Sequence, residues 1–158
     1  MFDLKERWQR FVRGYSGSDC CDLHYWFSET LPKMIITLRD YKHGYPELEF
    51  EEVDNFSIEW IEEAAKDIIK SKVESDLDEE LDLKDGFDRW QLILTRIAWC
   101  LEEIEKDINN EYWDEYWHGN TELKDKWLKK EKEIEDYKNK CKDEAFDLLK
   151  KYFWNLWD

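Results

Sequence analysis

Residues that interrupt regular backbone structure are scarce in this chain. Its 158 residues include two prolines and five glycines, and both prolines and three of the glycines fall between Arg13 and Pro46. No stretch longer than a few residues alternates polar and apolar residues as a half-buried strand does. The scarcity of turn residues excludes a sheet with many tight turns and favours long helices.

Sequence features of membrane, metal and catalytic proteins are also absent. No apolar run approaches the roughly 18 residues of a spanning helix, and the charged opening MFDLKERW is unlike a signal peptide. The three histidines lack a ligand spacing such as HExxH, there is no glycine-rich phosphate loop, and adjacent Cys20 and Cys21 form no CxxC pair. Asp19, Asp22 and His24 could form a small acid–base cluster, but no nucleophile motif or oxyanion motif accompanies them. We therefore predict reduced thiols in a cytosolic protein, with no catalytic residue, metal site or cofactor.

Negative charge is concentrated in one part of the chain. The 24 basic and 40 acidic residues leave a net charge of −16. Residues 1–46 carry +1, residues 47–85 carry −12 and residues 86–158 carry −5. A field of this sign disfavours non-specific binding to nucleic acid or to an anionic membrane, but an anion site can still exist in the neutral opening stretch. We interpret 47–85 as an acidic insertion, in which 74–85 is a loop, a weakly ordered arm or a continuation of a helix.

Hydrophobic periodicity predicts a single all-α domain of five to six helices with a long C-terminal helix. The predicted helices cover, with approximate ends, residues 2–13, 19–27, 28–42, 57–69, 87–108 and 121–157. The most regular stripe runs from Trp90 to Ile108, so this helix is predicted to be central, with the last helix packed along it. The apolar face of the first helix consists of Leu4, Trp8, Phe11 and Val12.

Aromatic residues are unusually frequent. They make up 16% of the chain, and its ten tryptophans are roughly four to five times the ordinary number. One small core has difficulty in burying so many rings, so we expect some of them in a pocket or at a subunit interface. This excess predicts a homo-oligomer, most simply a dimer.

One stretch combines turn residues, aromatic rings and basic groups: RGYSGSDCCDLHYWFSETLPKMIITLRDYKHGYP, residues 13–46. It resembles a recurrent stretch of small, mostly uncharacterised proteins of tailed bacteriophages, which runs Arg-Gly-Tyr/Trp-Ser/Asp, then Asp, then a Leu-Pro helix, then Gly-Tyr-Pro. The matching residues are Arg13–Ser16, Asp19, Asp22–Leu23, Leu31–Pro32 and His43–Pro46. Two later helices resemble that family loosely, whereas the acidic insertion and the paired cysteines depart from it. The resemblance implies a phage accessory protein in the host cell cytoplasm, where host takeover and defence evasion are common tasks.

The same stretch offers cations and aromatic rings without an acidic surplus. Nucleotides are bound by a stacking ring together with Arg or Lys for the phosphates. We therefore predict that it binds and sequesters a nucleotide-like signalling molecule without turnover, as a sponge that counters host defence. The predicted ligand-binding residues are Arg10, Arg13, Tyr15, His24, Tyr25, Trp26, Lys33, Arg39, Lys42, His43 and Tyr45.

Three alternatives to a nucleotide site stay open from the sequence. The aromatic residues Tyr25, Trp26 and Tyr45 could belong to the core, with the neighbouring cations paired with carboxylates. The acidic insertion could imitate a nucleic-acid backbone and occupy a basic site on a host protein. The tryptophan-rich ends could instead form the interface of a structural homo-oligomer.

Overall fold

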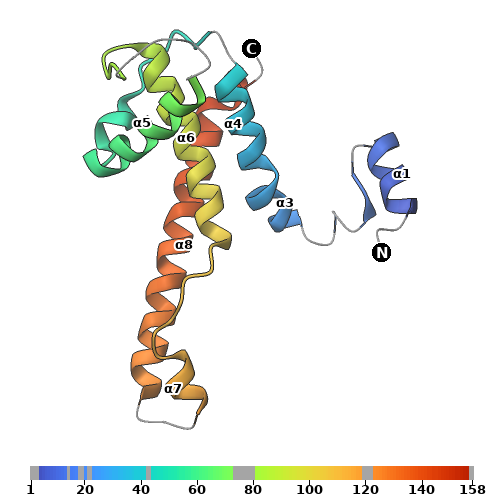
Figure 1. Ribbon diagram of the computed structural model, residues 1–158, viewed down its shortest axis with the longest axis vertical. Helices are drawn as coiled ribbons and strands as arrows, with labels where there is room; N and C mark the ends of the chain where they lie inside the picture. Colours follow the sequence, from blue (N-terminus) through green and yellow to red (C-terminus); the bar gives the residue numbers. More distant parts are fainter. Residues whose placement is uncertain are drawn as a thin grey trace.

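Every regular element in the described part of the chain is a helix. The computed structural model describes residues 4–13, 15–17, 20, 23–41, 44–72, 81–118 and 123–156. No strand occurs within these ranges, which confirms the predicted all-α fold with a long C-terminal helix. The elements are α1 (Leu4–Arg13), α3 (Leu23–Glu29), α4 (Leu31–Tyr41), the 3₁₀ helix η1 (Glu51–Asn55), α5 (Ile58–Lys72), α6 (Gly86–Glu105), α7 (Trp113–Trp117), α8 (Lys124–Tyr152) and the 3₁₀ helix η3 (Phe153–Asn155) (Figure 1).

α6 is the centre of the fold, as its hydrophobic period predicted. α8 packs along it, while α3, α4, α5 and η1 cover its other sides (Figure 1). The predicted stripe residues Trp90, Ile93, Leu94, Ile97 and Leu101 are all buried. Because α6 is covered from several directions, residues beside the stripe, such as Leu92 and Cys100, are buried as well.

α8 is much longer than the surface that it shares with α6. Its 29 residues extend over about 44 Å at 1.5 Å per residue. Its first half extends beyond α6, where α7 and the segment before α7 lie against it (Figure 1). In that segment Asn110 is buried and donates a hydrogen bond to Glu131 Oε1 of α8 at 2.8 Å. This anchoring accounts for the end of α6 at Glu105 rather than at the predicted Ile108, since the chain leaves the helix to run along α8.

The predicted acidic insertion contributes to the core. Phe50 and Val53 are each only 2% exposed. The Arg89 guanidinium of α6 donates hydrogen bonds to the carbonyl oxygen of Phe50 and to Asp54 Oδ1, the latter at 2.9 Å, and so fastens η1 to α6. The first part of the insertion therefore forms a 3₁₀ helix beside the core, because two of its apolar side chains are buried there. Most of the acidic run 74–85 lies outside the described residues.

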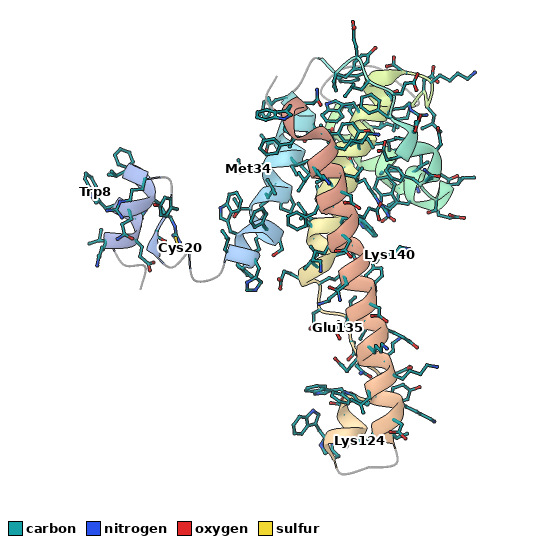
Figure 2. The ribbon with its side chains drawn as sticks, turned by 180° about the vertical axis from the view of Figure 1, so that it is seen from behind. Trp8, Cys20, Met34, Lys124, Glu135 and Lys140 are labelled. Carbon is teal, nitrogen blue, oxygen red and sulfur yellow. The ribbon has the colours of Figure 1, made fainter. Side chains whose placement is uncertain are left out.

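α1 stands to one side of the other helices (Figure 1). The helix predicted there is confirmed, and among the described elements it packs against no other. Its apolar residues are between 59% and 83% exposed, with Trp8 (labelled in Figure 2) at 66% and Phe11 at 83%. The chain after α1 turns back beside it, since the Gly17 N–H donates a hydrogen bond to Gln9 Oε1 at 3.1 Å and Ser16 is buried. α1 and residues 15–17 thus form a small hairpin, which we call the α1 hairpin.

Candidate functional site: an apolar groove beside the last helix

An apolar groove runs between the α3–α4 pair and the carboxyl-terminal part of α8. Its volume is about 740 Å³. The walls include the side chains of Trp26, Phe27, Leu31, Met34, Phe146 and Trp154. Among the described residues that line the groove, Lys150 is the one charged side chain. The site is therefore suited to an apolar ligand surface rather than to a charged one.

The groove exists because two helices have apolar faces wider than the surface they bury in the core. On α4, Ile35 is 3% exposed, whereas its neighbour Met34 is 55% exposed. On α8, Leu148 is 5% exposed, whereas Phe146 is 43% exposed. Each helix turns one part of its apolar face to the core and another part to the groove, where Met34 is labelled in Figure 2.

Aromatic rings join the two walls at the α3 end. The ring centroid of Phe27 lies 5.8 Å from that of Phe146, so α3 contacts α8 directly. Trp26 stands edge-on to Phe27 at 5.4 Å. Beyond the end of α8, Trp154 is 81% exposed. Exposed apolar surface that is concentrated in one groove marks a binding site in a soluble protein.

Three of the predicted ligand residues belong to the α1 hairpin. Arg10 and Arg13 lie on α1, and Tyr15 follows it; all three side chains are exposed. They lie away from the groove, because the whole hairpin stands apart from the rest of the described protein (Figure 1). The structure therefore does not bring them together with the other predicted residues.

Three more predicted residues lie on α3. His24 is exposed, with its Nε2 3.9 Å from Glu105 Oε1. The Tyr25 hydroxyl donates a hydrogen bond to Glu29 Oε1 at 2.6 Å, and this bond raises the pKa of Tyr25 above its ordinary value. Trp26 lines the groove. It is the one predicted ligand residue that the described part of the structure places there.

Arg39 is used inside the protein. Its side chain is 2% exposed, and its guanidinium donates hydrogen bonds to Asp67 at 2.7 Å, to Asp40 at 2.8 Å and to Thr95 at 3.0 Å. These contacts join α4 to α5 and α6. The Arg39 guanidinium, which was predicted to bind a ligand, is therefore enclosed by protein groups. This agrees with the alternative in which the cations of this stretch pair with carboxylates.

The remaining predicted residues do not converge on a common site. Lys33 is exposed on α4. Tyr45 lies near the start of α6, with its ring centroid 6.4 Å from that of Phe87. Lys42 and His43 lie outside the described residues. Within the described part of the chain, the predicted residues are thus spread over the α1 hairpin, α3, α4 and the segment after α4.

Sequence reasoning missed most of the groove. Neither Met34 nor Phe146 was among the predicted ligand residues. A partial signal existed near the end of the chain, because the tryptophan-rich end that includes Trp154 was a candidate for a subunit interface. Contact between α3–α4 and α8 brings these residues together, and no local pattern encodes that contact.

A second, polar cleft of about 990 Å³ lies between η1–α5 and α8. At this cleft Arg96 of α6 forms a two-pronged ion pair with Glu144 at 2.7 and 2.9 Å. Its guanidinium also lies over the rings of Trp60 and Trp99, at 4.8 and 4.5 Å from their centroids. Because the Arg96 guanidinium already interacts with this carboxylate and these rings, the cleft is a weaker candidate for a ligand-binding site than the groove.

Cys100 and Cys141 are expected to resist alkylation in the folded protein, whereas Cys20 reacts. Burial between α6 and α8 raises the pKa of both buried thiols, and the thiolate is the reactive form. Cys20 is exposed. Mass spectrometry of fragments after treatment with N-ethylmaleimide, with and without urea, measures this difference. Labelling of Cys100 at the rate of Cys20 without urea would show that the contact between α6 and α8 opens readily.

Comparison with known proteins identifies no family for this chain, so its description rests on the fold and the groove. No protein-family model, curated protein or solved structure matches the chain. Among the described residues no three potential metal ligands come together, and no helix there is long and apolar enough to cross a membrane. The chain is thus an all-α protein with an exposed apolar groove, and its resemblance to small phage proteins stays a prediction.

Proposed function

We propose that the protein acts by binding another polypeptide in its apolar groove, without turnover. The groove between α3–α4 and α8 is the observation that carries this proposal. Open apolar surface of this kind, lined by aromatic rings and a methionine, is typical of sites that receive a partner. Binding rather than catalysis was also predicted from the sequence, although for a different class of ligand.

The shape of the groove favours an amphipathic helix as the bound segment. One wall runs from Leu31 to Leu38 on α4, and the other runs from Phe146 on α8 to Phe153 at the start of η3. Each wall covers seven residue steps, or about 10.5 Å of helix. Helices that bind in grooves use apolar anchors at i, i+4 and i+7, which extend over the same length. Met34 gives the wall a flexible side chain that adapts to the anchors.

The groove does not favour a nucleotide. Phosphate groups require several charged or amide donors, and Lys150 is the one charged side chain among the described lining residues. Arg39 is occupied within the core. The nucleotide-like ligand of the segment 10–45 therefore stays a prediction that rests on its residue types alone.

The charge of the protein indicates the charge of its partner. A chain with a net charge of −16 attracts a helix whose polar face carries Lys or Arg and repels one that carries carboxylates. The resemblance to phage accessory proteins implies that such a partner belongs to the host. In this proposal the protein blocks a basic host protein through its apolar groove. The mimic alternative from the sequence also has a basic host target, but there the acidic insertion imitates a nucleic-acid backbone.

A synthetic amphipathic helix is expected to bind the full-length protein at one site. The peptide carries Trp, Phe and Leu on one face and Lys on the other, and calorimetric titration measures its affinity. Met34→Glu places a carboxylate against the apolar face of the peptide. We expect this variant to bind about 30-fold more weakly, the equivalent of about 2 kcal/mol.

Leu128→Glu is the matched control for this experiment. Leu128 is 47% exposed on α8, outside the groove, and its replacement adds the same charge. We expect it to bind the peptide as the unchanged protein does. An equal loss in both variants would assign the effect to charge rather than to the groove and would contradict the proposed function.

A further inference from the structure

The chain itself contains a helix of the kind that fits the groove. α1 presents Leu4, Trp8 and Phe11 at i, i+4 and i+7, and these side chains are 81%, 66% and 83% exposed. The distance from Leu4 to Phe11 is seven residue steps, about 10.5 Å, and equals the length of the groove walls. α1 therefore has the anchor spacing that a helix in this groove requires.

The charges of α1 and of the remaining chain are complementary. Four basic residues and one acidic residue give α1 a net charge of +3. Residues 14–158 carry −18, since the whole chain carries −16 and residues 1–13 carry +2. α1 is thus a basic amphipathic helix attached to an acidic protein with an apolar groove. A summed charge of this sign favours association of α1 with the body of a chain.

We infer that α1 of one copy docks in the groove of a second copy, and that the second copy returns the contact. The inference rests on the groove of the proposed function and names its resident ligand. Reciprocal exchange produces a closed twofold dimer in which both apolar surfaces of each chain are covered. The dimer agrees with the homo-oligomer predicted from the excess of tryptophan.

The area available is sufficient for a stable dimer. From their exposed fractions, Trp8 and Phe11 together offer roughly 300 Å² of surface. With both arms and an equal area from each groove, the exchange covers about 1,200 Å², which reaches the lower end of stable protein interfaces. Leu4 and Val12 of α1 add to this area.

The α1 hairpin favours a second copy over the chain's own groove. In the hairpin the bond between Gly17 and Gln9 keeps α1 beside the residues that follow it. From Gly17 to the start of α3 at Leu23 there are six residue steps, which span at most about 21 Å. A return to the chain's own groove requires the hairpin to swing back across α3 on this short connection. Docking in a second copy leaves the hairpin as it stands.

Sedimentation velocity of full-length variants at micromolar concentration tests the exchange. The unchanged protein is expected to be a dimer. Phe11→Glu in α1 and Met34→Glu in the groove are each expected to raise the dimer dissociation constant by about 30-fold or more. Leu128→Glu is the control outside the groove and leaves the dimer unchanged. Arg7→Glu alters the polar face of α1 and weakens the dimer by about fivefold or less, the range of an exposed charge.

Mixing the two dissociating variants separates exchange between copies from other arrangements. The Phe11→Glu chain retains an intact groove and the Met34→Glu chain retains an intact α1, so their mixture is expected to form a heterodimer with one docked arm. A mixture that associates no more strongly than either variant alone would overturn the inference, because it would place the interface elsewhere. A monomeric unchanged protein would overturn it as well.

Peptide titration of the Phe11→Glu protein distinguishes this inference from the proposed function. A peptide of residues 4–13 is expected to bind Phe11→Glu more tightly than it binds the unchanged protein, because the resident α1 no longer competes. If the basic amphipathic peptide binds the groove while the unchanged protein is monomeric, the inferred exchange of α1 is wrong, whereas the proposed binding of a partner helix is supported. If neither peptide binds Phe11→Glu, the function itself fails.

Discussion

Replacement of Trp90 by alanine is expected to lower the free energy of unfolding by about 3–5 kcal/mol, the range of large aromatic truncations in a core. Trp90 is 1% exposed at the centre of the fold. Its ring stacks on that of Phe50 at 5.6 Å between centroids and meets the edge of Tyr152 at 5.4 Å. The Trp90 side chain therefore joins α6 to the acidic insertion and to the end of α8, and its removal leaves a cavity among these three parts.

Urea unfolding followed by circular dichroism measures this loss. Trp117→Ala is the matched control, since this tryptophan is 65% exposed on α7, outside the core and the groove, and its replacement is expected to change the free energy of unfolding by about 1 kcal/mol or less. Loss of the Trp90 ring is also expected to loosen the acidic segment, because Phe50 loses its stacking partner. Similar unfolding midpoints for the two variants would show that the rings around Trp90 do not form the core.

The helical fold was predictable because it depends on local patterns. Apolar residues repeat at three and four through α6, so the helix and its central position followed from its own sequence. At the start of α5, Ser57 is a residue type that favours helix caps, and its Oγ accepts a hydrogen bond from the Trp60 N–H at 3.3 Å. Signals of this kind lie within a few residues of the structure that they specify.

The candidate site was less predictable because it depends on contacts between distant residues. The apolar period of α4 does not reveal that Met34 stays outside the core while Ile35 enters it, since that depends on where α8 lies. The exposure of α1 is likewise a property of the whole fold. A helix with a clear apolar face is normally expected to bury it, and nothing within the sequence of α1 states that it stands apart.

The distribution of cations was the least predictable feature. Arg39 and Lys33 lie six residues apart on the same helix, and both were grouped with the neighbouring rings as phosphate contacts. The structure buries the first and exposes the second. The difference arises from Asp67 and Thr95, which lie on α5 and α6 and approach only the side of α4 that faces them.

Arg39→Ala is expected to lower the free energy of unfolding by about 3 kcal/mol, at the lower end of the cost of breaking a buried ion pair. The 2% exposed guanidinium bonds to Asp40, Asp67 and Thr95, and its removal leaves a cavity between α4 and α6. The loss is at the lower end because the Asp67 side chain is 61% exposed and regains water. Urea unfolding measures it, with exposed Lys33→Ala expected to cost about 0.5 kcal/mol or less.

Arg39→Met separates the ion pairs from the packing. Methionine fills the space of the arginine stem without its charge, and replacement of buried ion pairs by apolar residues of similar volume is often nearly neutral. We therefore expect Arg39→Met to recover most of the stability that Arg39→Ala loses, to within about 1 kcal/mol of the unchanged protein. A methionine variant as unstable as the alanine variant would show that the contacts to Asp40 and Asp67 hold α4 in place. An alanine variant of unchanged stability would free Arg39 from a structural role and return it to the predicted ligand site.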